Sequence, residues 1–268
     1  MNGFPRPKKI HILGMEFAGT IDSIGKDVTR FEVGDRVFGA TRTFGAHAEY
    51  MRLPQDRGPA RIPDSVRFEE AAAIPFGGIS ALHFLKKAGI RAGQHVLIYG
   101  ASGSVGTAAV QLAKHFGAHV TGVCSTANLD LVKSLGADEV IDYTKDDFSK
   151  AGRIYDIIQD TVGKTHFARS VRALKRDGVY IDAGPGLSHL FGGLWARVTG
   201  AGKVKVVGEV AQGGVPALDF LAELVAEGEF RPVIDRRYPL ADIAEAHRYA
   251  EAGHKKGNVV INIAPNPA

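Results

Sequence analysis

The hydrophobic pattern is most regular around a short apolar run, Val96–Tyr99, that leads into a glycine-rich turn. Beyond the turn, apolar residues recur at helical spacing as far as Phe116. A strand, a glycine turn and a helix in this order form the part of a dinucleotide site that holds the pyrophosphate, because backbone N–H groups and the helix N terminus face the anion. The predicted pyrophosphate loop comprises Ala101, Ser102, Gly103, Ser104, Val105 and Gly106.

Two of the glycines in this loop have separate expected roles. A side chain at Gly103 would block the approach of the pyrophosphate, whereas Gly106 allows the helix to pack closely against the strand. Glycine turns also serve as plain connections, but the strand before this turn and the helix after it favour a nucleotide site.

Strand and helix patterns alternate through the rest of the central region. The predicted strands are Val96–Tyr99, His119–Val123, Glu139–Asp142, Tyr155–Thr161, Gly178–Ala183 and Lys205–Val210. The predicted helices are Val105–Phe116, Leu129–Leu135, Thr165–Leu174 and Ala217–Glu227. This alternation predicts a parallel sheet covered by helices on both faces, the doubly wound α/β class of the Rossmann fold.

The flanking regions have different patterns. Short strands are predicted at Met15–Ile24, Arg36–Ala40 and Ala46–Leu53, and a last strand at Asn258–Ile263. Helices are predicted at Phe68–Ile74, broken at Pro75 and resumed over Gly77–Ala88, and at Pro239–Ala252. We expect Asp64 and Ser65 to cap the first of these helices and Gly89 to end the second.

Composition restricts the class of protein only moderately. The 268 residues can form one large core or two smaller ones, and the net charge of +4 gives little support for a nucleic acid partner. No apolar stretch reaches the roughly 18 residues of a membrane span. Cys124 is the only cysteine, which excludes internal disulfides and favours a cytoplasmic location.

The candidate metal ligands do not form a convincing site. His115 and His119 are four residues apart, but Gly117 interrupts the helix that would bring them together. One cysteine cannot supply a structural zinc site, which needs four ligands. We therefore predict no bound metal.

Several separated motifs occur in an order that resembles the medium-chain dehydrogenase/reductase superfamily, within it the zinc-independent, quinone-oxidoreductase-like branch. The motifs are Gly14–Gly19, Val33–Gly39, Gly45–Tyr50, Ala101–Gly106, Ser134–Asp138 and Lys256–Val260. The resemblance implies a partial GroES-like, β-rich catalytic domain over 1–75, a Rossmann NAD(P)-binding domain over 76–229, and a return to the catalytic domain over 230–268. Relative to the family, the chain is shortened before the position of Leu13.

The resemblance also bears on zinc. Zinc-dependent members carry a Gly-His-Glu motif, and the corresponding residues here are Gly14, Met15 and Glu16. Methionine is not a zinc ligand in such sites. The resemblance therefore implies chemistry without zinc.

The choice between NADPH and NADH depends on the residues after the second strand. NAD sites commonly carry an acidic residue there, which holds the ribose hydroxyls, but the stretch Val123–Asn128 contains none. The hydroxyls of Ser125 and Thr126 and the amide of Asn128 could accept a 2′-phosphate, so NADPH is favoured over NADH. Relatives often place Arg or Lys at the position of Ala127. Alternatively, the stretch only caps the helix that starts near Leu129.

Further site residues follow from the resemblance alone. The implied cofactor contacts are Ser80, Tyr143, Val162, Gly163, Ala183, Gly184 and Asn258. Phe38, His47 and Trp195 are the implied lining of a substrate pocket. His47 is also a possible proton donor, because a histidine has a suitable pKa.

No side chain stands out as a general acid or base, which fits chemistry carried by a cofactor. The expected activity is hydride transfer from NAD(P)H to a quinone or an α,β-unsaturated carbonyl compound. Two alternatives remain: an NADPH-binding protein with little or no catalysis, because part of the catalytic domain is missing, and an NAD(P)-dependent alcohol dehydrogenase.

A second subunit is the expected partner, besides a small-molecule substrate. The strand Lys205–Val210 is predicted at an open sheet edge, where pairing with its copy would give a homodimer. Alternatively, the following helix covers this edge. Neither a nucleic acid nor a membrane is expected as a partner.

Overall fold

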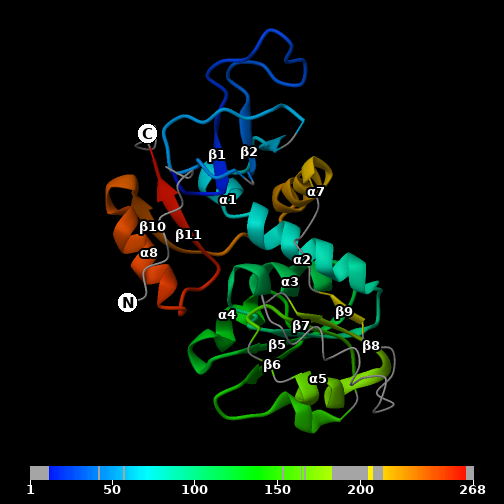
Figure 1. The fold of residues 1–268 in the computed structure, drawn as a ribbon. Helices are drawn as coiled ribbons and strands as arrows, with labels where there is room; N and C mark the ends of the chain where they lie inside the picture. Colours follow the sequence, from blue (N-terminus) through cyan, green and yellow to red (C-terminus); the bar gives the residue numbers. More distant parts are fainter. Residues whose placement is uncertain are drawn as a thin grey trace.

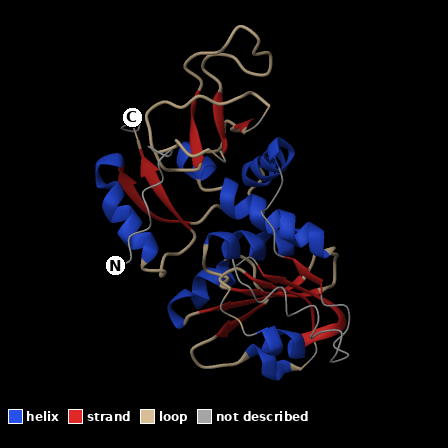
Figure 2. Ribbon diagram, in the orientation of Figure 1, coloured by secondary structure: helices blue, strands red, loops and turns tan. Residues whose placement is uncertain are grey.

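The structure of the chain, a computed structural model, describes residues 12–41, 43–56, 58–152, 154–163, 165, 167–182, 205–207 and 214–263. Three sheets organise these residues (Figure 1). Three strands lie in the amino-terminal part, six in the central part and two in the carboxy-terminal part (Figure 2).

The central sheet has six parallel strands in the order β6-β5-β4-β7-β8-β9. Their bounds are β4 His95–Tyr99, β5 His119–Cys124, β6 Glu139–Asp142, β7 Tyr155–Asp160, β8 Leu174–Asp182 and β9 Lys205–Val207. The order reverses between β4 and β7, which are neighbours in the sheet, so the carboxyl ends of these strands flank the crevice where such folds bind ligands. The predicted Rossmann class is confirmed.

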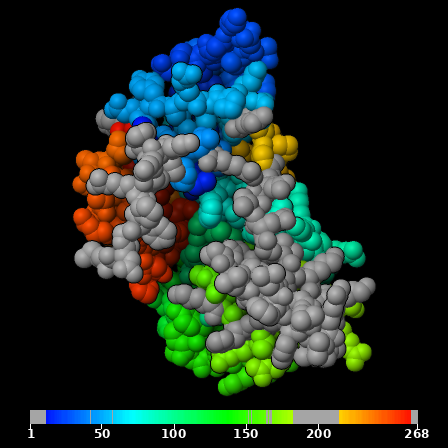
Figure 3. Space-filling view, viewed as in Figure 1, coloured from blue at the N-terminus to red at the C-terminus, as the bar shows by residue number. Residues whose placement is uncertain are grey.

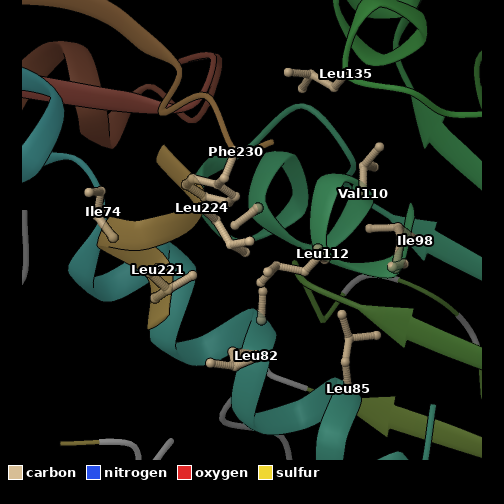
Figure 4. Packing of buried hydrophobic residues seen from close by; sticks show 14 of the residues in the cluster. Ile74, Leu82, Leu85, Ile98, Val110, Leu112, Leu135, Leu221, Leu224 and Phe230 are labelled. Atoms are coloured by element: carbon tan, nitrogen blue, oxygen red, sulfur yellow. The ribbon is translucent and has the colours of Figure 1, made fainter. Parts of the chain in front are cut away.

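Helices cover both faces of this sheet. They are α2 Pro75–Ala88, α3 Ser104–His115, α4 Leu129–Ser134, α5 Phe167–Ala173 and α7 Gly214–Ala226. Val96 and Ile98 of β4 face a large core with α2, α3 and α7, whereas Leu97 faces a smaller core that contains Ala173 of α5. Figure 4 shows Leu82, Leu112 and Leu221 in the larger core. Burial on both faces explains why β4 is a continuous apolar run.

The amino-terminal sheet pairs β1 (Glu16–Thr20) with β2 (Arg36–Ala40), and β2 with β3 (Pro59–Arg61), all antiparallel. The predicted strand Ala46–Leu53 is wrong, because this segment is irregular. Gly45 enters it with a positive φ of 106°, and the N–H of His47 donates to the carbonyl of Leu13 over 2.9 Å, outside any sheet.

Of the two helices before the central sheet, the first begins at Phe68 as predicted but has another cap, and the second begins two residues before its predicted start. The first, α1 (Phe68–Ala72), has Arg67 rather than Asp64 or Ser65 as its N-cap, and the Arg67 N–H donates to the Glu70 carboxylate over 3.0 Å. Helix α2 starts at Pro75 itself, because proline has no N–H to leave unpaired and its φ suits a first helical residue. Gly89 ends α2 with a left-handed φ of 75°, as predicted.

The carboxy-terminal part returns to the amino-terminal sheet. Strands β10 (Ile234–Pro239) and β11 (Asn258–Asn262) are parallel, and α8 (Ile243–Glu251) connects them after a short 3₁₀ turn at Leu240–Asp242. Strand β10 was not predicted, because its charged residues hide the strand pattern. Figure 1 shows this part in orange and red, on one side of the amino-terminal strands in blue, and Figure 3 shows its surface in the same colours.

Candidate functional site

The predicted pyrophosphate loop comprises the turn after β4 and the first residues of α3. Gly103 is the N-cap of α3, and no side chain accepts a hydrogen bond from this helix end. The N–H groups of Ser104, Val105 and Gly106 occupy the first three helical positions, so they have no acceptor within the helix. Together with the positive end of the helix dipole, these three donors form an arrangement that favours an anion.

Gly103 and Gly106 differ in the space that surrounds their Cα atoms. Among the described residues, a Cβ added to Gly103 would meet only the Gly100 carbonyl oxygen, at 3.6 Å, so these residues leave the space over Gly103 open. A Cβ added to Gly106 would lie 2.1 Å from the same oxygen, a distance that no side chain tolerates. The helix packs against the strand through Gly106 and leaves room for a ligand at Gly103.

The carboxy-terminal part fixes this loop from outside. The Gly257 N–H donates to the Ser102 carbonyl over 2.8 Å. The Ser104 hydroxyl donates to Oδ1 of Asn258 over 2.6 Å, and Nδ2 of Asn258 donates to the carbonyls of Ala73 and Val233, each over 3.1 Å. Both ends of the Asn258 amide are thus engaged within the chain, and the residue positions the α3 N terminus.

The residues expected around the adenosine lie at the carboxyl ends of β5 and β6. Nδ2 of Asn128 donates to the hydroxyls of Ser102, over 3.0 Å, and of Ser125, over 3.2 Å. Oδ1 of Asn128 is buried, and no partner for it is found among the described residues. Neither helical turn that starts in this segment has a side-chain cap, so its polar groups do not serve as caps.

Asp142, at the end of β6, was not among the predicted site residues. Oδ2 of Asp142 accepts from the Thr126 hydroxyl over 2.5 Å, and Oδ1 accepts from the Thr144 hydroxyl over 2.7 Å and the Thr144 N–H over 3.0 Å. These hydrogen bonds, that of Thr126 first, lower the pKa of Asp142 to about 2, so the carboxylate is ionised at neutral pH. Tyr143, the next residue, is exposed, with its ring 6.3 Å from that of Tyr99.

Asp160, at the end of β7, organises the loop expected beside the nicotinamide ribose. Its buried Oδ1 accepts from the N–H groups of Val162, over 2.9 Å, and Gly163, over 2.8 Å. Its Oδ2 accepts from the N–H of Thr165 over 2.8 Å. Ser80 is buried on α2. Ala183 and Gly184 lie outside the described residues.

Of the predicted substrate-pocket residues that the structure describes, His47 lines a cleft and Phe38 does not. Phe38 is fully buried in the large core and exposes no surface to a substrate, which corrects that assignment. His47 lines a cleft of about 1550 Å³ between the amino-terminal sheet and β11, with its ring 5.7 Å from that of His247. Burial, and the neighbouring His247, lower the pKa of His47. Trp195 lies outside the described residues.

Glu16 is a further group that sequence reasoning did not single out. Its carboxylate accepts the N–H of Phe76, in the first turn of α2, over 2.7 Å. Burial of the carboxyl group raises the pKa of Glu16 from 4.5 to about 7, although the Phe76 N–H and the charge of Lys255 oppose the rise. The role of Glu16 follows from a hydrogen bond to a residue 60 positions later in the chain, which the sequence pattern does not reveal.

The described residues contain no cluster of three or more His, Cys, Asp or Glu side chains placed to hold a metal ion. Met15, at the position where zinc-dependent members carry histidine, is partly exposed. In the same part of the chain, no helix is long and apolar enough to cross a membrane.

The donor set fits a dinucleotide. The α3 N terminus offers three N–H groups to a pyrophosphate, and the open space over Gly103 leaves room for it. The unpartnered Oδ1 of Asn128 marks a polar position at the adenosine side. A doubly wound sheet with this loop at its switch point defines the class of NAD(P)-binding proteins.

Comparisons with known proteins agree with this class. Residues 1–64 match the family described as the alcohol dehydrogenase GroES-like domain, and residues 135–261 match the zinc-binding dehydrogenase family. The chain is 33% identical over 268 residues to a chloroplastic quinone-oxidoreductase homolog of Spinacia oleracea, covering 95% of this chain and 81% of that protein. It is 34% identical over 267 residues to 2-methylene-furan-3-one reductase of Solanum lycopersicum, covering 94% of this chain and 63% of that protein.

The quinone oxidoreductase from Coxiella burnetii has a similar solved structure, with a TM-score of 0.81, 29% identity, and coverage of 94% of this chain and 79% of that chain. The chain belongs to the medium-chain dehydrogenase/reductase superfamily, in its quinone-oxidoreductase-like branch, and is an NAD(P)H oxidoreductase.

Proposed function

We propose that the chain reduces a quinone or an α,β-unsaturated carbonyl compound with NADPH, without zinc. The observation that carries this proposal is the uncapped N terminus of α3 facing open space over Gly103. The names of the relatives, quinone oxidoreductase and furanone reductase, support the two substrate classes.

The residues of the chain bind and orient, and the bound nicotinamide supplies the hydride. The N–H groups of Ser104, Val105 and Gly106 hold the pyrophosphate. Asp160 fixes the loop of Val162 and Gly163, so that its backbone stays in one position beside the nicotinamide ribose. By holding a cofactor and a substrate in one geometry, these residues would remove the entropic cost of an encounter in solution.

The preference for NADPH rests on two features of the segment after β5. The segment Val123–Asn128 itself contains no carboxylate that would repel a 2′-phosphate. The Ser125 hydroxyl accepts from Asn128 over 3.2 Å, which leaves its own hydrogen to donate to a phosphate oxygen.

The test is oxidation of NADPH and of NADH in the presence of a panel of quinones, enones and alcohol–ketone pairs. We expect turnover with quinones or enones and faster reaction with NADPH. Tight NADPH binding without turnover on any of them would instead support the non-catalytic binding protein, and turnover confined to alcohols would support an alcohol dehydrogenase.

Removal of metal tests the zinc-independent part of the proposal. Met15 provides no zinc ligand, so we expect the same activity after dialysis against a strong chelator. Loss of activity that added zinc restores would contradict the zinc-independent reaction.

Cytoplasmic localisation stays a prediction, which imaging of a tagged chain would check.

A further inference from the structure

The hydrogen bonds of Asp142 determine which hydroxyl hydrogens face outward at the adenosine side. An ionised carboxylate can only accept hydrogen bonds. The Thr126 hydroxyl, 2.5 Å from Oδ2 of Asp142, therefore donates its single hydrogen to the carboxylate, and the Thr144 hydroxyl does the same over 2.7 Å. Both threonines are exposed, and both offer only lone pairs to a ligand.

Ser125 is arranged in the opposite way. Its oxygen accepts from Nδ2 of Asn128, and no acceptor for its own hydrogen is found among the described residues. The two amide hydrogens of Asn128 are spent on Ser102 and Ser125. Thus Ser125 is a donor toward a ligand, whereas Thr126, its neighbour in the chain, is an acceptor.

These two hydroxyls suit the two nucleotides differently. The 2′-hydroxyl of NADH can donate to the lone pairs of Thr126. The ionised 2′-phosphate of NADPH can only accept hydrogen bonds, so it gains a hydrogen bond from Ser125. Thr126 offers it only a second acceptor, and the negative charge of Asp142 lies directly behind that acceptor. Lys145 offsets this charge only from the exposed side, with Nζ 3.7 Å from Oδ2 of Asp142.

We propose that Asp142 is a specificity-determining residue, which limits the preference for a 2′-phosphate over a 2′-hydroxyl by holding Thr126 as a hydrogen-bond acceptor. This inference rests on the proposed cofactor site, but not on turnover. The inference predicts that the site tolerates NADH because of Asp142 at the end of β6. NAD sites usually carry their acidic residue in the segment after β5.

The test compares two nucleotide fragments, adenosine 2′,5′-bisphosphate and 5′-AMP, which differ only in the 2′-phosphate. Calorimetric titration of Asp142→Asn at pH 8 should give a ratio of the two affinities shifted about tenfold toward the bisphosphate. The charge is lost and the Thr126 hydroxyl can then turn outward. Asp146→Asn makes the same change of charge in the same loop, away from Thr126, and should leave the ratio within about twofold.

A second variant keeps the inference testable if Asp142→Asn does not fold. Thr126→Val removes the acceptor, so 5′-AMP should bind several-fold more weakly while the affinity for the bisphosphate stays nearly constant. An unchanged ratio in folded Asp142→Asn, or an equal shift in Asp146→Asn, would overturn the inference and leave the proposed function standing. A wild-type chain that binds neither fragment would overturn both.

Discussion

Gly103 and Gly106 are three residues apart, yet the lack of a side chain has a different purpose at each position. The backbone of Gly103 is extended, with φ −81° and ψ 178°, a conformation that any residue adopts. Its lack of a side chain therefore matters to a ligand rather than to the fold. Gly106, whose added Cβ would lie 2.1 Å from the Gly100 carbonyl oxygen, matters to the fold itself.

Alanine substitutions separate these two roles. Gly106→Ala should lower the free energy of unfolding by about 1–3 kcal/mol, because the helix must move away from the Gly100 carbonyl. Gly103→Ala is the matched control and should keep the wild-type stability in urea denaturation. Equal stability of the two variants would contradict the packing role of Gly106.

A larger side chain tests the ligand role of Gly103. Gly103→Val should fold and should bind NADPH at least about tenfold more weakly, because its side chain fills the space assigned to the pyrophosphate. Fluorescence titration of the nucleotide measures this affinity. Wild-type affinity in the folded variant would refute that placement.

The carboxylates at the site show where sequence reasoning stops at the residue scale. The glycine loop could be predicted because its roles follow from a local pattern of strand, turn and helix. Asp142 and Glu16 act through partners on other elements: Thr126, 16 residues before Asp142, and Phe76, 60 residues after Glu16. Spacing along the sequence does not reveal such partners.

At the scale of elements, α2 begins against a buried carboxyl group on β1. Glu16 accepts the Phe76 N–H over 2.7 Å, at the positive end of the helix, while burial raises its pKa to about 7. Lys255 is the charged group that acts on Glu16 directly, and Asp235 acts on Lys255 in turn. The junction between the amino-terminal sheet and α2 is thus sensitive to protonation.

The sign of this sensitivity follows from the raised pKa. Between pH 4.5 and about 7, folding takes up a proton at Glu16, so its contribution to stability falls as the pH rises through this range. Glu16→Gln keeps an acceptor for Phe76 but does not titrate. The stability of the wild type relative to the variant should therefore decline from pH 4.5 to 7 in chemical denaturation, and a constant difference would contradict the assignment.

The elements of the central sheet could be predicted better than those around it. Strand β4 is buried on both faces, so its apolar run predicts it without knowledge of the neighbours. Strand β10, with Asp235, Arg236 and Arg237 in its middle, exists because β11 pairs with it. The segment Ala46–Leu53 has a strand-like composition but no sheet partner, so tertiary context overrides its propensity.

At the scale of the whole molecule, β9 is the last strand at one edge of the six-stranded sheet that the described residues form. Only Lys205–Val207 of the predicted interface strand are described, and residues 208–210 lie outside. The homodimer therefore stays a prediction, supported by the position of β9 at an edge that a two-fold related copy could extend.

Proline at this edge tests the dimer. Val207→Pro removes a backbone donor from β9 and should shift the chain from dimer to monomer at micromolar concentration, as measured by light scattering. A substitution at an exposed position on α4, which contacts β6 at the opposite edge of the sheet, Asp130→Ala, should leave the dimer intact. A monomeric wild type, or a dimeric Val207→Pro variant, would disprove the interface.

The bond between Gly257 and Ser102 has a consequence for how the protein is made. A ribosome releases the chain from its amino terminus, so the strands and helices of the central sheet emerge well before residue 257. The glycine loop, however, is fastened by the Gly257 N–H and by Asn258, 154 residues after Ser104. During synthesis the nascent chain therefore holds a nearly complete sheet with a loop that is not yet fixed, and a nucleotide can first bind tightly once residues 257 and 258 have emerged and folded back.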